Sequence, residues 1–350
     1  MLLTLMSVSS SVSAVQRGNV GAMLDEIDET LSQGKNSHLG QGPLDRWSEE
    51  LNANRKRWDK DYGIRFSLEY APIYHYGTQD GPDNKSLNQG LDFYLRWENA
   101  MQLDGYSGSL DLLMIHRKDD LLSTNTQQFN DSRNSVTSPN DANVEGTFNA
   151  LANLSWESLL LNEQLDITLG QFYIPGMFDE NDILGNDRSS FMAGPLSNNP
   201  ARVIPDSEIG MGMGVWYSPH GSFTLGAAIT QAEADGKNLN FDKFNGNWTY
   251  MAAFDWSPKI SNWGQGNYRF TYSTIDATGA AGDAQSSSRG FNISIDQELG
   301  STLAFALRYA DNDGKRQDIE KLLSAAIVFK QVLGYQQDEL GFASFWIDPA

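Results

Sequence analysis

The sequence predicts an all-β fold, an antiparallel transmembrane β-barrel, on three observations. From Gly63 onward, apolar and polar residues alternate with a period of two to the end of the chain, as in strands whose two faces meet different environments. The connections between these segments are short and long in turn, which is typical of membrane-spanning barrels. Beyond the N-terminus, the chain has no apolar run of the roughly 20 residues that a membrane-spanning helix needs. A membrane-spanning structure would therefore have to be a barrel.

The composition excludes several classes of protein. The chain has 350 residues and a formal net charge of −20, from 45 acidic and 25 basic residues. Nothing supplies the basic surface that phosphates require, so we expect no nucleic-acid partner. Because cysteine is absent, disulfides and thiolate metal sites are impossible. The mean hydropathy of −0.45 is ordinary for a soluble protein, but a barrel that alternates polar and apolar residues has a similar average.

The first 60 residues do not follow the two-residue period. Residues 1–14 end in Val-Ser-Ala after a short apolar stretch, which predicts a secretory signal peptide, with an ordinary chain terminus as the alternative. Residues 15–60 are expected to form a periplasmic helical leader, because apolar residues recur there at helical spacing. A loosely attached acidic tail is the alternative for the first helix. The spaced residues are Val20, Leu24, Ile27 and Leu31, then Leu44, Trp47 and Leu51.

Residues 61–350 are predicted to form the barrel itself, with about thirteen strands. The alternation is clear over residues 64–70, 91–98, 268–273 and 303–309. It is less clean over residues 109–117, because Leu112 to Ile115 are all apolar. Bacterial barrels close with an even number of strands, so we expect the chain to be incomplete at its C-terminal end by about three strands.

The segment 170–217 joins the longest loop to the most unusual strand. One face of the strand is nearly bare, with Gly210, Gly212 and Gly214, while the other carries Ile209, Met211, Met213, Val215 and Tyr217. A bare glycine face leaves room for something large. The loop before it is rich in Asp, Asn, Pro and Gly, and long irregular loops are usually functional. We therefore expect residues 170–207 to fold into the lumen as a constriction loop.

Two stretches of this segment carry a resemblance to a known family. They read GQFYIPGMFDENDILGNDRSSFMAGPL and NNPARVIPDSEIGMGMGVWYSP, with weaker matches at GPLDRWSEEL, Gly63-Ile64 and DELG. In these residues the chain resembles the OprB-type carbohydrate-selective porins of Gram-negative outer membranes. The resemblance implies a barrel of sixteen strands, in contact with outer-membrane lipids and lipopolysaccharide. It implies passive uptake of sugars through a monomeric or trimeric pore, without enzymatic activity, cofactor or metal.

The candidate pathway residues have the chemistry that sugars require. A sugar channel needs planar hydrogen-bonding groups and some aromatic surface, and it must bind weakly to allow flux. The inward rows of the strands supply Arg96, Glu98, Trp216, Arg269 and Arg308. The loop supplies Asp179, Glu180, Asp182, Asp187, Arg188 and Arg202, of which the two arginines are the strongest constriction candidates. For each charged strand residue, the alternative is a structural role in a network of charges along the barrel wall. For each loop arginine, the alternative is an internal staple, an ion pair within the loop that fixes its conformation without contacting solute.

Other functions remain open at this point. Clustered carboxylates in residues 179–187 could bind calcium, but Gly185 is not where a calcium loop needs its glycine. A carboxylate pair could hydrolyse glycosides, although nothing fixes its separation. The four histidines, His38, His75, His116 and His220, have no metal-site or triad spacing. A barrel enzyme with a rim cluster, or an adhesin or receptor using the loop 118–145, are the alternatives to a channel.

Overall fold

The structure is a computed structural model. It describes residues 20–33, 43–77, 83–119, 121–122, 124–132, 146–185, 191–239, 241, 244–279, 285–334 and 339–350. The predicted signal peptide lies outside these ranges, and so do the predicted site residues Asp187 and Arg188.

Antiparallel strands make up most of the described chain, as the two-residue period predicts. The strands are β1 (Ile64–Tyr76), β2 (Lys85–Leu103), β3 (Tyr106–Lys118), β4 (Thr147–Leu160), β5 (Leu165–Tyr173), β6 (Ile209–His220), β7 (Phe223–Gln231), β8 (Trp248–Trp256), β9 (Lys259–Ile260), β10 (Gly264–Ile275), β11 (Ser288–Glu298), β12 (Leu303–Asn312), β13 (Ile319–Lys330) and β14 (Glu339–Pro349). The helices are α1 (Val20–Gln33), α2 (Pro43–Tyr62), α3 (Thr126–Asp131), α4 (Ile174–Phe178) and α5 (Gly194–Ser197).

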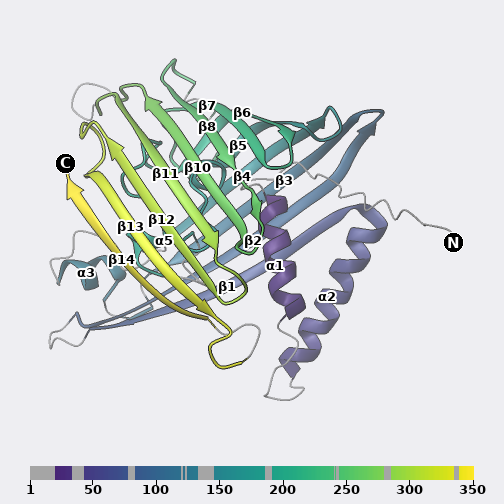
Figure 1. The fold of residues 1–350 in the computed structure, drawn as a ribbon, viewed down its shortest axis with the longest axis horizontal. Helices are drawn as coiled ribbons and strands as arrows, with labels where there is room; N and C mark the ends of the chain where they lie inside the picture. Colours follow the sequence, from purple (N-terminus) through teal and green to yellow (C-terminus); the bar gives the residue numbers. More distant parts are fainter. Residues whose placement is uncertain are drawn as a thin grey trace.

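The strands form one sheet in which neighbours in sequence are neighbours in space. Thirteen strands follow one another from β1 to β14, and the two-residue strand β9, which the sequence did not predict, pairs with β10 beside this path. In Figure 1 the sheet curls, so that β13 and β14 pass in front of the blue strands. Among the described residues, β1 pairs only with β2 and β14 only with β13. The β2–β3, β4–β5 and β6–β7 turns define the short-turn end of the sheet; the opposite end is the long-loop end.

The two faces of the sheet differ in chemistry. Its outer face carries rows of large exposed apolar side chains, as a lipid-facing surface does; among them are Tyr70, Tyr74, Trp97, Tyr217, Tyr250, Phe254, Phe270, Tyr272 and Phe329. At the short-turn end, the Trp256 ring lies 6.2 Å from that of Phe223 and 5.2 Å from that of Tyr268, centroid to centroid. The inner face carries Arg96, Arg269, Arg308 and other polar residues that are buried. No described helix is both long enough and apolar enough to cross a membrane.

Helices α1 and α2 occupy the segments that the helical spacing predicts. The sequence predicted a periplasmic leader before the barrel, and in the structure α1 packs on the inner face of the sheet. Val20 and Leu24 are buried there against Tyr94 of β2 and Leu113 of β3. An apolar helix face this short is stable only when it is packed against other structure, and the inner face provides that packing.

The position of α1 explains the irregular alternation in β3. Leu113 and Ile115 lie on the inner face, where other strands carry polar residues, and both belong to the cluster around Val20 and Leu24. Leu112 and Met114 lie on the outer face. The apolar run at 112–115 therefore marks a strand with apolar residues on both faces, of which the inner face is covered by α1.

Candidate functional site

The loop between β5 and β6, residues 174–208, is called here the infolded loop, and its described residues, 174–185 and 191–208, lie across the inner face. It begins with α4, which covers the glycine row of β6. A Cβ atom added at Gly210 would lie 3.1 Å from Cδ1 of Ile174, and one added at Gly214 would lie 3.5 Å from Cε of Met177. The glycine face therefore makes room for α4, as the sequence predicted.

Side chains from the inner face of the sheet, called here the wall, hold the backbone of the infolded loop in place. Thr271 of β10 donates to the Phe178 carbonyl at 2.9 Å, and Ser294 of β11 donates to the Glu180 carbonyl at 2.8 Å. Further along the loop, Ser324 donates to the Pro195 carbonyl at 2.6 Å and Asn312 to the Ala201 carbonyl at 3.0 Å. A buried irregular segment must find partners for its peptide groups, and hydroxyl and amide side chains of β10–β13 supply them.

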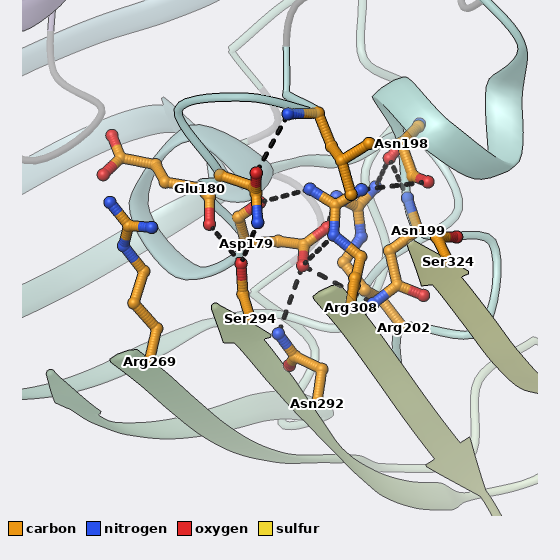
Figure 2. A network of polar contacts seen from close by, with 12 residues as sticks. Asp179, Glu180, Asn198, Asn199, Arg202, Arg269, Asn292, Ser294, Arg308 and Ser324 are labelled. Carbon is orange, nitrogen blue, oxygen red and sulfur yellow. Dashed lines mark hydrogen bonds and ion pairs between the residues drawn. The ribbon is translucent and has the colours of Figure 1, made fainter. Parts of the chain in front are cut away.

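Asp179 is the centre of the polar network that fastens the loop. Its carboxylate accepts a hydrogen bond from Nη1 of Arg202 at 2.8 Å and one from Nδ2 of Asn292 at 3.1 Å. Nε of Arg308 lies 3.5 Å from the same carboxylate. Figure 2 shows Asp179 between these groups, with Arg202 coming from the loop and Arg308 and Asn292 from the wall. All four side chains are buried.

The two arginines also bind other parts of the loop. Arg308 donates from Nη1 to the Leu196 carbonyl at 2.9 Å, and its side chain has no exposed surface. Arg202 donates to Glu208 at 2.7 Å. Of the two interpretations of Arg202, the contacts are those of an internal staple, because a buried guanidinium group that donates to Asp179 and Glu208 of the loop has little surface left for a solute. For Arg308, they place the side chain behind the inner surface of the sheet, covered by the loop.

Asp182 and Arg269 form a second link between loop and wall, nearer the short-turn end. Nη2 of Arg269 lies 2.8 Å from Asp182, and Arg269 also pairs with Asp296 of β11. Nδ2 of Asn267 donates to Asp182 at 2.9 Å. The Asp182 side chain is 59% exposed and that of Arg269 only 9%, so the negative end of this pair is the one in contact with water.

Arg96 lies in a buried charge network within the wall. It donates to Asp111 of β3 at 2.9 Å and pairs with Glu157 of β4. Nε of Arg96 lies 3.8 Å from Glu98, which keeps about a third of its side chain exposed (32%). The sequence predicted both Arg96 and Glu98 as pathway residues, and the structure leaves only Glu98 accessible to water.

Trp216 is buried, although the sequence suggested it as an exposed platform for sugars. Its ring lies over Gly226 of the neighbouring strand, where an added Cβ would fall 1.8 Å from Cζ3 of the indole. On its other side it meets Phe178 of α4, with 4.7 Å between ring centroids. Trp216 therefore lies between the sheet and the infolded loop and packs against both.

Several residues of the site escaped the sequence analysis. Asn181 accepts from the amides of Ile183 and Leu184, at 3.1 and 2.9 Å, and donates to Ser294 at 3.0 Å. Asp111 and Glu157 complete the Arg96 network. Asn181 stands within an acidic run and could have been found as an Asx-turn residue, whereas the burial of Asp111 and Glu157 follows only from packing.

Within the described ranges, no group of three His, Asp or Glu side chains has the geometry of a metal site.

Comparison with known proteins gives similarity in structure only. No family model matches the chain, and no curated protein matches it. OprB of Pseudomonas putida, in its high-pH structure, matches with a TM-score of 0.67 and 15% identity, over 86% of this chain and 78% of that one. The low-pH structure of the same protein matches with a TM-score of 0.52 and 13% identity, over 85% and 81%. At these identities the similarity shows the fold alone: this chain has the antiparallel barrel fold of OprB, as its sequence predicted.

Proposed function

We propose that this protein is a passive diffusion channel of a Gram-negative outer membrane, and that small carbohydrates are its preferred solutes. The observation that carries the proposal is the infolded loop, which is fastened across the inner face by Asp179, Arg308 and the hydroxyls of β10–β13. A loop held in this way narrows the enclosed space permanently. A sheet with an apolar outer face and a narrowed polar interior suits permeation of small polar solutes.

The preference for carbohydrates rests on the resemblance of residues 170–219 to the OprB-type porins and on the shared fold. Sugars are neutral and rich in hydroxyl groups, so a weakly binding polar surface is sufficient for them. We assign the water-facing surface to Glu98, Glu180 and Asp182, with Arg96, Arg202 and Arg308 fixing the wall and loop behind it. The places of Asp187 and Arg188 in the solute pathway stay predictions. The channel would contact outer-membrane lipid and lipopolysaccharide as a monomer or trimer.

Liposome swelling tests this proposal directly. The purified full-length chain is reconstituted, and swelling rates are compared for glucose, a disaccharide and an amino acid of glucose-like size. Faster swelling in glucose than in the amino acid supports a sugar-preferring channel, whereas equal rates support a general one. No swelling in any solute, with protein shown by circular dichroism to be folded and by vesicle flotation to be inserted, contradicts a channel function.

A further inference from the structure

The N-terminal helix α1 lies on the same side of the sheet as the infolded loop. The apolar residues of α1 are spaced three and four apart, and the two most deeply buried, Val20 and Leu24, are at most 1% exposed. Their neighbours in the cluster come from the inner faces of three successive strands and from the start of β6: Tyr94, Leu113, Ala150, Ala152 and Ile209. Figure 1 shows α1 beside these strands.

The inner wall is adapted to this helix. Where α1 packs, β3 carries Leu113 and β4 carries Ala150 and Ala152, and all three are buried. Elsewhere along β3 and β4 the buried inward residues are charged or polar, as at Asp111, Glu157 and Asn153. Small and apolar inward residues in one patch of a polar wall leave both space and a favourable surface for an apolar helix face. A helix that only rested outside the barrel would not need this patch.

The other side of α1 is polar and is held by two arginines. Asp25 lies 2.7 Å from Nη2 of Arg65 on β1, and Asp28 lies 3.0 Å from the same atom. Asp28 is also 2.6 Å from Nη2 of Arg55 on α2. The side chain of Asp25 is nevertheless 61% exposed, against 14% for Arg65. This side of α1 therefore faces water while its other side faces the wall.

Helix α1 also reaches the base of the infolded loop. Tyr173 at the end of β5 and Ile209 at the start of β6 both pack in the α1 cluster, and these residues immediately flank the loop. The loop covers the inner face from β6 toward β13, and α1 covers it from β2 to β4. Together they cover the two parts of the inner face that lie on either side of β5.

We propose that α1 is a fixed wall of the pore, so that the size limit and conductance of the channel are set by α1 and the infolded loop together. This inference rests on the proposed channel function. It assigns residues 20–33, which the sequence placed in a periplasmic leader, to the permeation pathway. Asp25 and Asp28 would then contact passing solutes, while Val20 and Leu24 would stay out of reach of water.

Thiol labelling during single-channel recording tests the proposal, because the natural chain contains no cysteine and gives no background reaction. Full-length Asp25→Cys and Leu24→Cys variants are treated in planar bilayers with a charged, membrane-impermeant methanethiosulfonate. We expect Asp25→Cys to react and to show a stepwise loss of conductance, and Leu24→Cys to stay unmodified. Asp104→Cys, in the exposed β2–β3 turn, is the matched control and should react without a comparable step.

A second variant gives an independent measurement. Leu24→Asp places a charge in the buried α1 cluster and should detach the helix, which would raise the single-channel conductance of a sheet that remains folded by circular dichroism. Two results would overturn the proposal: labelling at position 25, confirmed by mass spectrometry, without any change in conductance, or labelling of Leu24→Cys as fast as Asp25→Cys. An unmodified chain that forms no channel would instead contradict the proposed function itself.

Discussion

Asp179 accepts a hydrogen bond from Nη1 of Arg202 at 2.8 Å across 23 residues of the same loop, with both side chains buried. A buried ion pair contributes little net stability compared with an apolar pair, but removal of one partner leaves an uncompensated charge. The pair therefore fixes one conformation of the infolded loop rather than adding much to the stability of the sheet.

Arg202→Ala should loosen the infolded loop and widen the channel. Removal of one partner from a buried pair costs about 3–5 kcal/mol when nothing replaces it, and we expect less here because Arg308 still faces Asp179. The loop should give way before the sheet does. Liposome swelling should become faster with a disaccharide and change less with glucose. Lys315→Ala, at an exposed ion pair with Asp313, is the control; disaccharide swelling equal in both variants would show that Arg202 does not hold the constriction.

Gly210→Val should displace α4 from the wall. A Cβ atom added at this position would lie 2.9 Å from Cβ of Thr230 and 3.1 Å from Cδ1 of Ile174. Overpacking of this kind lowers the stability of the fold by about 1–3 kcal/mol. The size limit for solutes in swelling assays should change. Ala227→Val, on the exposed outer face of the adjacent strand, adds methyl groups without this clash and should leave the limit as it is. The same size limit in both variants would contradict the role given to the glycine row.

In the proposed channel, Asp182→Asn should lower the permeability to cations relative to anions. The carboxylate of Asp182 is exposed and its guanidinium partner is buried, so the pair presents negative charge to the water. One charge several ångströms from the ion path in water changes the relative permeability of cations and anions by about two- to threefold. The reversal potential in a KCl gradient measures this ratio. Glu163→Gln, in the exposed β4–β5 turn, should leave it unaltered, and the prediction fails if Asp182→Asn does so too.

Acid should weaken the contact between the start of β11 and Asp313, which directly follows β12 at the long-loop end. Burial alone would raise the pKa of the Asp313 carboxyl. Hydrogen bonds from Ser288 Oγ at 2.6 Å and Lys315 Nζ at 3.1 Å outweigh this effect, so the pKa of Asp313 lies below the ordinary 3.8. Because the folded chain binds this proton more weakly than the unfolded chain, the stabilisation is present above the unfolded pKa and disappears as the pH falls through the folded pKa.

Hydrogen exchange measures this effect at the amide of Arg289, which donates to Asp313 at 3.4 Å. After correction for intrinsic exchange rates, its protection should fall between pH 5 and pH 3 in the natural chain. In Asp313→Asn the protection should be lower at pH 5 and independent of pH over that range. A pH dependence that persists in Asp313→Asn would assign the acid sensitivity to another group.

The sequence alone determined the strands, because their two faces meet different environments. In β12, Leu303, Phe305 and Leu307 alternate with small or polar residues, and this period of two can be recognised without any tertiary contact. The glycine row of β6 likewise indicated that another part of the molecule packs closely on that face, because glycine within a strand often marks such a close approach. The fold class was therefore predictable, and it is confirmed by the similarity of the structure to OprB.

Only the tertiary structure decided which charged residues meet water. Alternation places Arg308 on the inner face, but its burial depends on Asp179, Leu196 and Asn198, more than 100 positions earlier in the chain, whose backbone carbonyls accept hydrogen bonds from it. The same holds for Leu113, whose apolar character is explained by α1, more than 80 residues before it. A local pattern reports the direction of a side chain from the backbone. What covers that side chain depends on the packing of distant segments, because burial and desolvation are properties of the folded whole.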